Sequence, residues 1–172
     1  MKLIIVGGGA SGLVAAVTAA RTMKHAEDII LLEGGAKPGR KILSTGNGHC
    51  NLTNEKALPM AYYSDNAMLL DDLLARFSYR DALDFFNDLG IPSVSRDGYY
   101  YPKNREAAAV RDALVSEVQR LGVRMVTNTR IVKAEKNPDC FVLTTENGRE
   151  FRADRVILAA GGMAAPKTGS DG

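Results

Sequence analysis

Three glycines near the start of the chain have the spacing of a nucleotide-binding turn. An apolar run at residues 3–6 leads into Gly7, Gly9 and Gly12, and an Ala-rich helical stretch follows. In such a turn one glycine makes the tight bend, the next lets the backbone approach a pyrophosphate, and the last lets helix and strand pack closely. The free N–H groups at the start of the helix then face the phosphates, and the helix dipole favours their negative charge.

A carboxylate, Glu33, follows the second apolar run at residues 29–32. At this distance from the glycines an acid accepts hydrogen bonds from the adenosine ribose hydroxyls, and it disfavours a 2′-phosphate and therefore NADP. A glycine-rich turn between any strand and helix would explain the glycines alone. The combination of strand, helix and acid favours a dinucleotide site.

The elements around the turn predict an α/β fold. Strands at 2–6 and 28–32 flank a helix at 11–23, which makes a parallel, right-handed βαβ unit. We expect further helices at 66–77, 79–89 and 105–121, a hairpin turn at Asp97-Gly98, and strands at 123–127, 130–135, 140–145, 150–153 and 155–159.

Length and composition fit one globular domain. The 172 residues are 45% apolar and 24% charged, and a net charge of +2 does not by itself indicate a nucleic-acid or membrane partner. No transmembrane span or secretion signal is readable. Cys50 and Cys140 do not have the spacing of metal ligands, so we expect no metal site and reduced thiols in the cytoplasm.

Residues 34–54 are predicted to be a long irregular loop, a feature that is uncommon unless it is functional. Arg40 and Lys41 could neutralise a diphosphate, while Gly46 and Gly48 would allow backbone amides to approach a ligand. Two exposed cations in a solvated turn are an equally good explanation of Arg40 and Lys41.

Two other stretches allow two interpretations each. The small residues at 159–162 could let the backbone pass close to a cofactor, although a tight turn after a core strand explains them more simply. The tyrosines at 99–101 could form an aromatic wall for a planar substrate, but strand propensity is the favoured explanation.

The glycine motif, the Gly-Arg-Lys…Ser-Thr-Gly-Asn-Gly-His-Cys-Asn-Leu-Thr-Asn run at 39–54 and the closing run at 159–172 together resemble the HI0933-like family of FAD-dependent oxidoreductases, also called the BaiN or YhiN group. The resemblance implies a Rossmann-like FAD-binding domain of the glutathione-reductase type. Such a domain has a parallel sheet and an antiparallel β-meander inserted before the last strand, which the strands at 130–153 fit. It also implies flavin-mediated hydride transfer that reduces a carbon–carbon double bond, with a steroid-like molecule or an RNA uracil as the substrate and NAD(P)H as a candidate electron donor.

The resemblance also carries the FAD contacts over to individual positions. The resemblance carries no catalytic residue over to this chain, and His49 stands where many relatives carry Arg. No Cys-x-x-x-x-Cys pair is present, which disfavours a disulfide reductase. The implied contacts are Gly7, Gly9, Ser11 and Gly12 at the pyrophosphate, Glu33 at the ribose, Arg40, Lys41, Gly46, Asn47 and Cys50 from the long loop, Ile131 at the adenine, and Ala160 and Gly161 in place of the family's Thr-Gly pair.

Members of this family are longer than this chain. By resemblance, residues 1–172 are one FAD-binding domain that lacks the second domain and the segment that contacts the flavin ring. We therefore expect weak FAD retention, little turnover by this chain alone, and self-association through exposed apolar surface.

Two other classes of function stay open. An NAD-binding dehydrogenase domain would use the same glycine motif, and the presence of a yellow flavin would distinguish the two. A non-catalytic nucleotide-binding domain would bind no flavin. Direct RNA contact by this chain is disfavoured, because its cations are interleaved with acids.

Overall fold

A computed structural model describes residues 1–162, except the side chains of residues 46, 47 and 59. The closing run at 163–172, which contributes to the family resemblance, lies outside the described residues. By internal contacts the chain divides into two compact units. Unit 1 holds residues 1–42 and the chain from residue 114 onward, and unit 2 holds residues 43–113. Each unit is described by itself.

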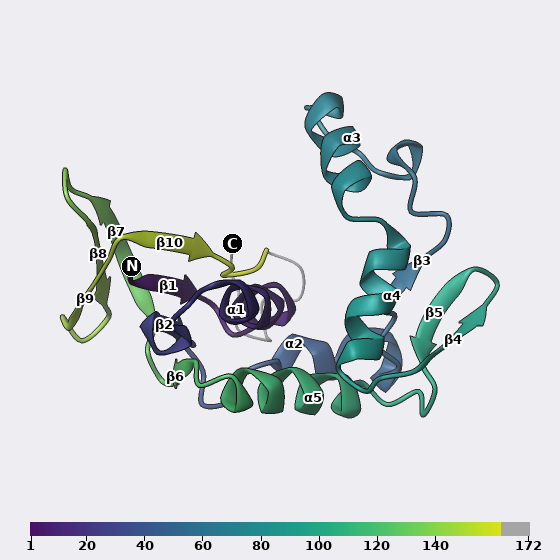
Figure 1. The fold of residues 1–172 in the computed structure, drawn as a ribbon, viewed down its shortest axis with the longest axis horizontal. Coiled ribbons are helices and arrows are strands. Elements are labelled where there is room, and N and C mark those ends of the chain that lie inside the picture. Colours follow the sequence, from purple (N-terminus) through teal and green to yellow (C-terminus); the bar gives the residue numbers. More distant parts are fainter. Residues whose placement is uncertain (163–172) are drawn as a thin grey trace. The chain divides into compact units, whose positions relative to one another are not determined.

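Unit 1 is built on a four-stranded parallel sheet with the strand order β10-β1-β2-β6 (Figure 1). The first two strands and the helix between them form the predicted βαβ unit, because both strands are short, fully apolar runs that a parallel sheet buries. The elements are β1 (Leu3–Val6), α1 (Ala10–Thr22), a 3-10 turn η1 (Ala26–Asp28), β2 (Ile29–Leu32), a short helix α2 (Arg40–Leu43), β6 (Arg124–Val126) and β10 (Arg155–Leu158).

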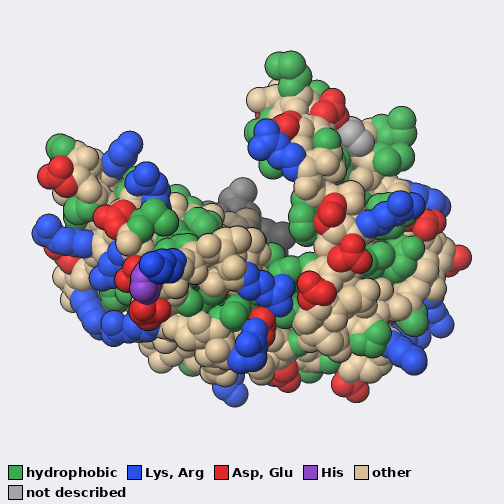
Figure 2. Space-filling model, viewed as in Figure 1, with side chains coloured by type: hydrophobic (Ala, Val, Ile, Leu, Met, Phe, Trp, Pro, Cys, Tyr) green, Lys and Arg blue, Asp and Glu red, His purple; other side chains and the backbone are tan. Residues whose placement is uncertain are grey.

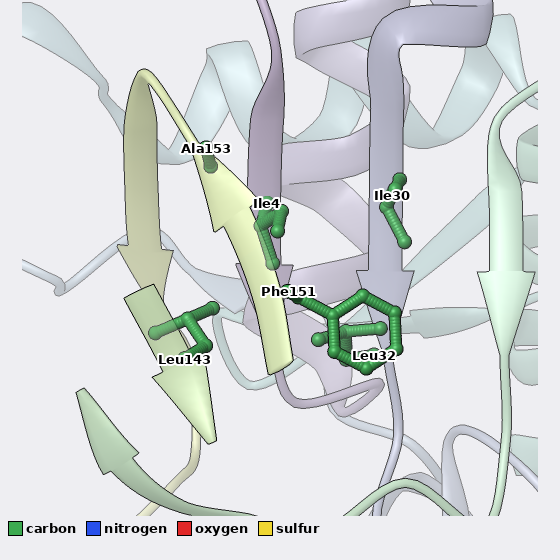
Figure 3. Close-up of a cluster of buried hydrophobic side chains, with 6 residues drawn as sticks. All are labelled: Ile4, Ile30, Leu32, Leu143, Phe151 and Ala153. Atoms are coloured by element: carbon green, nitrogen blue, oxygen red, sulfur yellow. The ribbon is translucent and has the colours of Figure 1, made fainter. Parts of the chain in front are cut away.

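A three-stranded antiparallel meander precedes β10 and consists of β7 (Ile131–Lys136), β8 (Phe141–Thr145) and β9 (Glu150–Ala153). Since successive side chains of a strand point to opposite faces, alternate residues of β1 and β2 face this meander and the others face α1. The predicted Rossmann-type fold with an inserted meander is confirmed. The core between parallel sheet and meander is formed by Ile4, Ile30, Leu32, Leu143, Phe151 and Ala153 (Figure 3).

Unit 2 combines α-helices with a small antiparallel sheet of order β3-β5-β4. Asp97 and Gly98 have φ values of 52° and 87°, which confirms the predicted hairpin turn between β4 and β5. The elements are η2 (Thr45–Gly48), β3 (Thr53–Asn54), η3 (Pro59–Ala61), α3 (Ala67–Arg76), α4 (Tyr79–Asp88), β4 (Ser93–Arg96), β5 (Tyr99–Pro102) and the first part of α5 (Ala107–Arg120).

The helices of unit 2 differ in how they are held. A capping box of Ser78 and Asp81 fixes the start of α4. By contrast, α3 has an exposed apolar face: Met68 is 82% and Leu73 is 54% exposed, and hydrophobic side chains stand out over this helix in Figure 2. None of the helices in residues 1–162 is both long enough and apolar enough to span a membrane.

The prediction of an irregular chain at 34–54 is wrong in part, because α2, η2 and β3 lie within it. Only two residues of β3 pair with β5, opposite Tyr99 and Tyr100. A two-residue strand has no periodicity in the sequence, and its existence depends on a partner some fifty positions away.

Candidate functional site

The turn after β1 packs backbone directly on backbone. Gly7 has a φ of 104°, a left-handed conformation that favours glycine, and its N–H donates to the Leu32 carbonyl at 2.8 Å. A Cβ atom on Gly7 would overlap the Ala159 carbonyl oxygen, and a Cβ atom on Gly12 would overlap the Gly7 carbonyl oxygen. The fold therefore requires glycine at both Gly7 and Gly12.

The fold makes no such demand at Gly9, the residue before α1. Its φ of −76° and ψ of −170° are extended, and no atom of the described residues lies within 4 Å of a Cβ built on it. The start of α1 has no side-chain cap at Gly9 and no acid in its first turn, where Ser11 is exposed. The first N–H groups of a helix have no partner within the helix, and beside open space they form an anion site; this arrangement fits the pyrophosphate of a dinucleotide.

Glu33 is fixed beside this turn by two backbone amides. Its Oε2 accepts from the Gly8 N–H at 2.7 Å, and its Oε1 accepts from the Gly35 N–H at 2.6 Å. The Gly8 carbonyl in turn accepts from the Gly39 N–H at 2.7 Å. A carboxylate has about four lone-pair positions, so Glu33 keeps the capacity to accept ribose hydroxyls. The motif analysis did not single out Gly8, because that position of the motif accepts any residue.

The backbone around Glu33 is also joined to the segment between β6 and β7. The Glu33 N–H donates to the Val126 carbonyl at 2.9 Å, and the Glu33 carbonyl accepts from the Thr129 N–H at 2.8 Å. Next to this junction lies a cavity of about 450 Å³ whose lining includes Gly34, Asn128 and Arg130. This volume lies in the range of small-ligand sites.

Ile131, the residue predicted to lie at the adenine, opens β7 directly after that cavity. It pairs with Thr145 and packs against the core cluster. Its neighbour Arg130 lines the cavity instead. Gly34 and Asn128, which the sequence analysis did not single out, also line this cavity. Asn128 has a positive φ of 51°, a conformation that asparagine tolerates better than most residues, but its type alone does not reveal this in the sequence.

The chain after β10 lies against the glycine turn. The Ala159 N–H donates to the Val6 carbonyl at 2.8 Å, and Ala160 and Gly161 follow it as exposed residues. Lys41, in α2, donates from Nζ to the Gly162 carbonyl at 3.0 Å. Arg40 is exposed at the start of α2. Unit 1 therefore brings the end of β10 to the motif glycines and places Lys41 at the segment that follows.

Three further predicted contacts, Gly46, Asn47 and Cys50, belong to unit 2. Gly46 and Asn47 lie in η2, and Cys50 is buried. Burial raises the pKa of the Cys50 thiol, and a hydrogen bond with Thr45 offsets this rise only in part. A thiol that stays protonated at neutral pH is a poor nucleophile, so Cys50 packs as a small apolar group.

The glycine turn, the uncapped helix start and the acid after the second strand of a parallel sheet define a dinucleotide-binding domain of the Rossmann type. Comparison with known families agrees with this class. The family model described as HI0933-like protein Rossmann domain matches residues 1–172. The chain therefore belongs to the HI0933-like family.

Two relatives and one solved structure show which proteins this chain is similar to. It is 43% identical over 171 residues to a 3-dehydro-bile acid delta(4,6)-reductase of Clostridium scindens, covering 99% of this chain and 41% of that protein. It is 31% identical over 167 residues to a ribosomal RNA dihydrouridine synthase of Escherichia coli, covering 97% and 41%. The chain thus spans about two fifths of the length of these relatives. A 3-ketosteroid-delta4-(5alpha)-dehydrogenase from Rhodococcus jostii RHA1 shares the fold, with a TM-score of 0.67 and 18% identity over 95% of this chain and 46% of that one.

Proposed function

We propose that this chain forms the FAD-binding part of a flavin-dependent oxidoreductase that reduces a carbon–carbon double bond by hydride transfer. The observation that carries the proposal is the open space at Gly9, beside the uncapped start of α1 and within the turn that fixes Glu33. The bile acid relative is named as a reductase, which supports reduction as the type of reaction.

The residues of this chain would bind and orient the cofactor. FAD, when bound, supplies the hydride-transfer chemistry, and we propose NAD(P)H as the electron donor. The cations of α2 would offset the charge of the diphosphate. The proposed contacts are Gly7, Gly9, Ser11 and Gly12 for the pyrophosphate, Glu33 for the ribose, Ile131 and the cavity beside Arg130 for the adenine, and Arg40, Lys41, Gly46, Asn47, Cys50, Ala160 and Gly161 for the remainder.

An equilibrium titration tests the cofactor assignment without depending on retention during purification. Quenching of FAD fluorescence by the purified chain would be followed, with ADP and NAD added as competitors. FMN, which lacks the adenosine half, is the matched control ligand. We expect FAD to bind, ADP to compete with it, and FMN to bind at least tenfold more weakly, because the contacts proposed in unit 1 are to the ADP moiety.

The other outcomes separate the alternative functions. Tighter binding of NAD than of FAD would replace the flavoenzyme with an NAD-binding dehydrogenase domain. An absence of binding by FAD, ADP and NAD alike would refute the dinucleotide site and leave a non-catalytic domain. Reduction of a double bond is then tested with a family member that spans the full length of the relatives, by following NADPH or NADH oxidation in the presence of an unsaturated substrate.

A further inference from the structure

A second cavity, of about 480 Å³, lies entirely within unit 2. Its lining includes Arg96, Tyr99 and Tyr101, all from the β4–β5 hairpin. Within the described part of the chain, none of these three side chains has a hydrogen-bond or ion-pair partner. Guanidinium and phenol groups donate hydrogen bonds, so this wall presents several donors that have no protein acceptor. The volume falls in the range of small-ligand sites.

Arg105 is the most informative residue of this cavity. Its Nε is buried and has no hydrogen-bond partner within residues 1–162. A buried guanidinium nitrogen without a partner is energetically costly, and a ligand that accepts its hydrogen bond would remove that cost. The ligand that fits must therefore bring an acceptor.

The backbone of Arg105 is held in a conformation that is rare for a residue with a side chain. Its φ is +59°. The Arg105 N–H donates to the Pro102 carbonyl at 2.7 Å, and the Arg105 carbonyl lies 2.7 Å from His49 Nδ1, which must carry the proton because a carbonyl only accepts. These two bonds fix the backbone from which the guanidinium extends. Such strained positions concentrate at ligand sites.

The cavity also contains one acceptor, Asp97, at the turn of the hairpin. An ionised carboxylate only accepts hydrogen bonds. A sulfate ion, or a carboxylic acid that has lost its proton, would bring only lone pairs to Asp97. Inorganic phosphate keeps at least one proton at neutral pH, so it can accept from the arginines and also donate to Asp97.

The formal charges of the lining match one small anion. Arg96, Arg105 and Asp97 leave a single positive charge when His49 is neutral. This charge suits one phosphate group that keeps a proton. It falls short of the repeated charges of a nucleic-acid strand.

We propose that this cavity binds a phosphate group that keeps a proton, either as inorganic phosphate or as the monoester of a small molecule. Arg105 and Arg96 donate to its unprotonated oxygens, and its P–OH group donates to Asp97. The site does not rest on the proposed function, because all of its residues belong to unit 2 and no flavin takes part.

Isothermal titration calorimetry of this chain, in a buffer without phosphate or sulfate, tests the proposal. The probes are inorganic phosphate and sulfate, which share a tetrahedral shape, but sulfate has no proton to donate. We expect phosphate to bind at least tenfold more tightly than sulfate, and Arg105→Gln to weaken phosphate binding at least tenfold. Lys103→Gln removes an exposed cation that does not line the cavity, and it should change the affinity less than twofold.

The variant Asp97→Asn tests the role of the acceptor. Asparagine tolerates the φ of 52° that Asp97 adopts, so the hairpin turn is kept. Its side-chain NH2 group can donate to sulfate. We expect the preference for phosphate over sulfate to fall below about threefold, a change that a merely structural role of Asp97 would not produce.

Five results would overturn the phosphate site. They are an absence of phosphate binding, equal binding of phosphate and sulfate by the parent chain, equal effects of Arg105→Gln and Lys103→Gln, an unchanged preference in Asp97→Asn, and displacement of phosphate by FAD or by oligouridylate at lower concentration than by glycerol 3-phosphate. Tighter binding of glycerol 3-phosphate than of inorganic phosphate would support a monoester as the ligand, and the reverse order would support free phosphate. If the melting temperature shows that Arg105→Gln is unfolded, Arg96→Gln takes its place.

Discussion

Substituting two glycines of the same turn by alanine should separate cofactor binding from folding. Gly12→Ala places a methyl group on the Gly7 carbonyl oxygen, and backbone cannot rotate away as a side chain can. Overpacking costs typically 1–3 kcal/mol, and the upper part of that range applies here because the neighbour is rigid. Better helix propensity returns about 1 kcal/mol. We expect a net loss of about 2 kcal/mol in the free energy of unfolding.

Gly9→Ala should leave stability almost unchanged. Nothing in the described residues lies within 4 Å of the added Cβ, and the backbone angles of Gly9 suit any residue. Alanine is a poorer N-cap than glycine by about 0.5 kcal/mol, and its lower entropy in the unfolded chain returns about 0.4–1 kcal/mol. The new methyl group would instead occupy the space that a pyrophosphate approaches. We expect FAD and ADP to bind at least tenfold more weakly, which corresponds to about 1.4 kcal/mol.

Urea unfolding and FAD titration of both variants give the two numbers needed. A loss of about 2 kcal/mol in a chain of this size lowers the melting temperature by about 4–8 °C. The reasoning is refuted if Gly9→Ala binds FAD as tightly as the parent chain, because the pyrophosphate then does not pass Gly9. It is also refuted if Gly12→Ala is as stable as the parent chain, since the contact with Gly7 would then be absent in solution.

Three other substitutions or reagents test separate parts of the structure. Glu33→Gln turns the side-chain NH2 group toward one of the two backbone N–H groups from which Glu33 now accepts a hydrogen bond. Urea unfolding should therefore show a loss of about 1–2 kcal/mol in the free energy of unfolding, together with weaker FAD binding. A loss no larger than that caused by Glu27→Gln, at an exposed position, would contradict this expectation. Hydrogen bonds first from Arg120 and then from Arg21 lower the pKa of Glu117 to about 2. The stabilisation is therefore complete above pH 4.5 and is lost as the pH falls toward 2, so Glu117→Gln should reduce stability by about 1–2 kcal/mol at pH 7 and have progressively less effect between pH 4.5 and 2. If the difference in melting temperature between Glu117→Gln and the parent chain did not change with pH, this link between α1 and α5 would be contradicted. Cys50 is buried with a raised pKa, whereas Cys140 is half-buried, so a thiol reagent should label Cys140 first in the native protein; faster labelling of Cys50, read by mass spectrometry, would show that η2 opens.

The parts of the fold that could be predicted are those whose information is local. The apolar runs of β1 and β2 are continuous in the sequence, and the bend between β1 and α1 needs glycines that follow one another at fixed spacing. The hairpin at Asp97-Gly98 is set by two residues that tolerate positive φ. In each case the physical cause and its effect lie within a few residues, so neither the partner strand nor the core needs to be known.

The parts that could not be predicted depend on residues far apart in the chain. Gly8 matters because it lies between the carboxylate of Glu33 and the N–H of Gly39, and neither partner is recognisable from position 8 alone. Arg105 is stronger evidence for the same point. In the sequence, Arg105 is one of many cations and nothing distinguishes it. In the folded chain its Nε is buried, and its carbonyl is hydrogen-bonded to His49, more than fifty positions earlier. An unsatisfied buried nitrogen is a property of the assembled unit, so it can be recognised only once the fold of that unit is known.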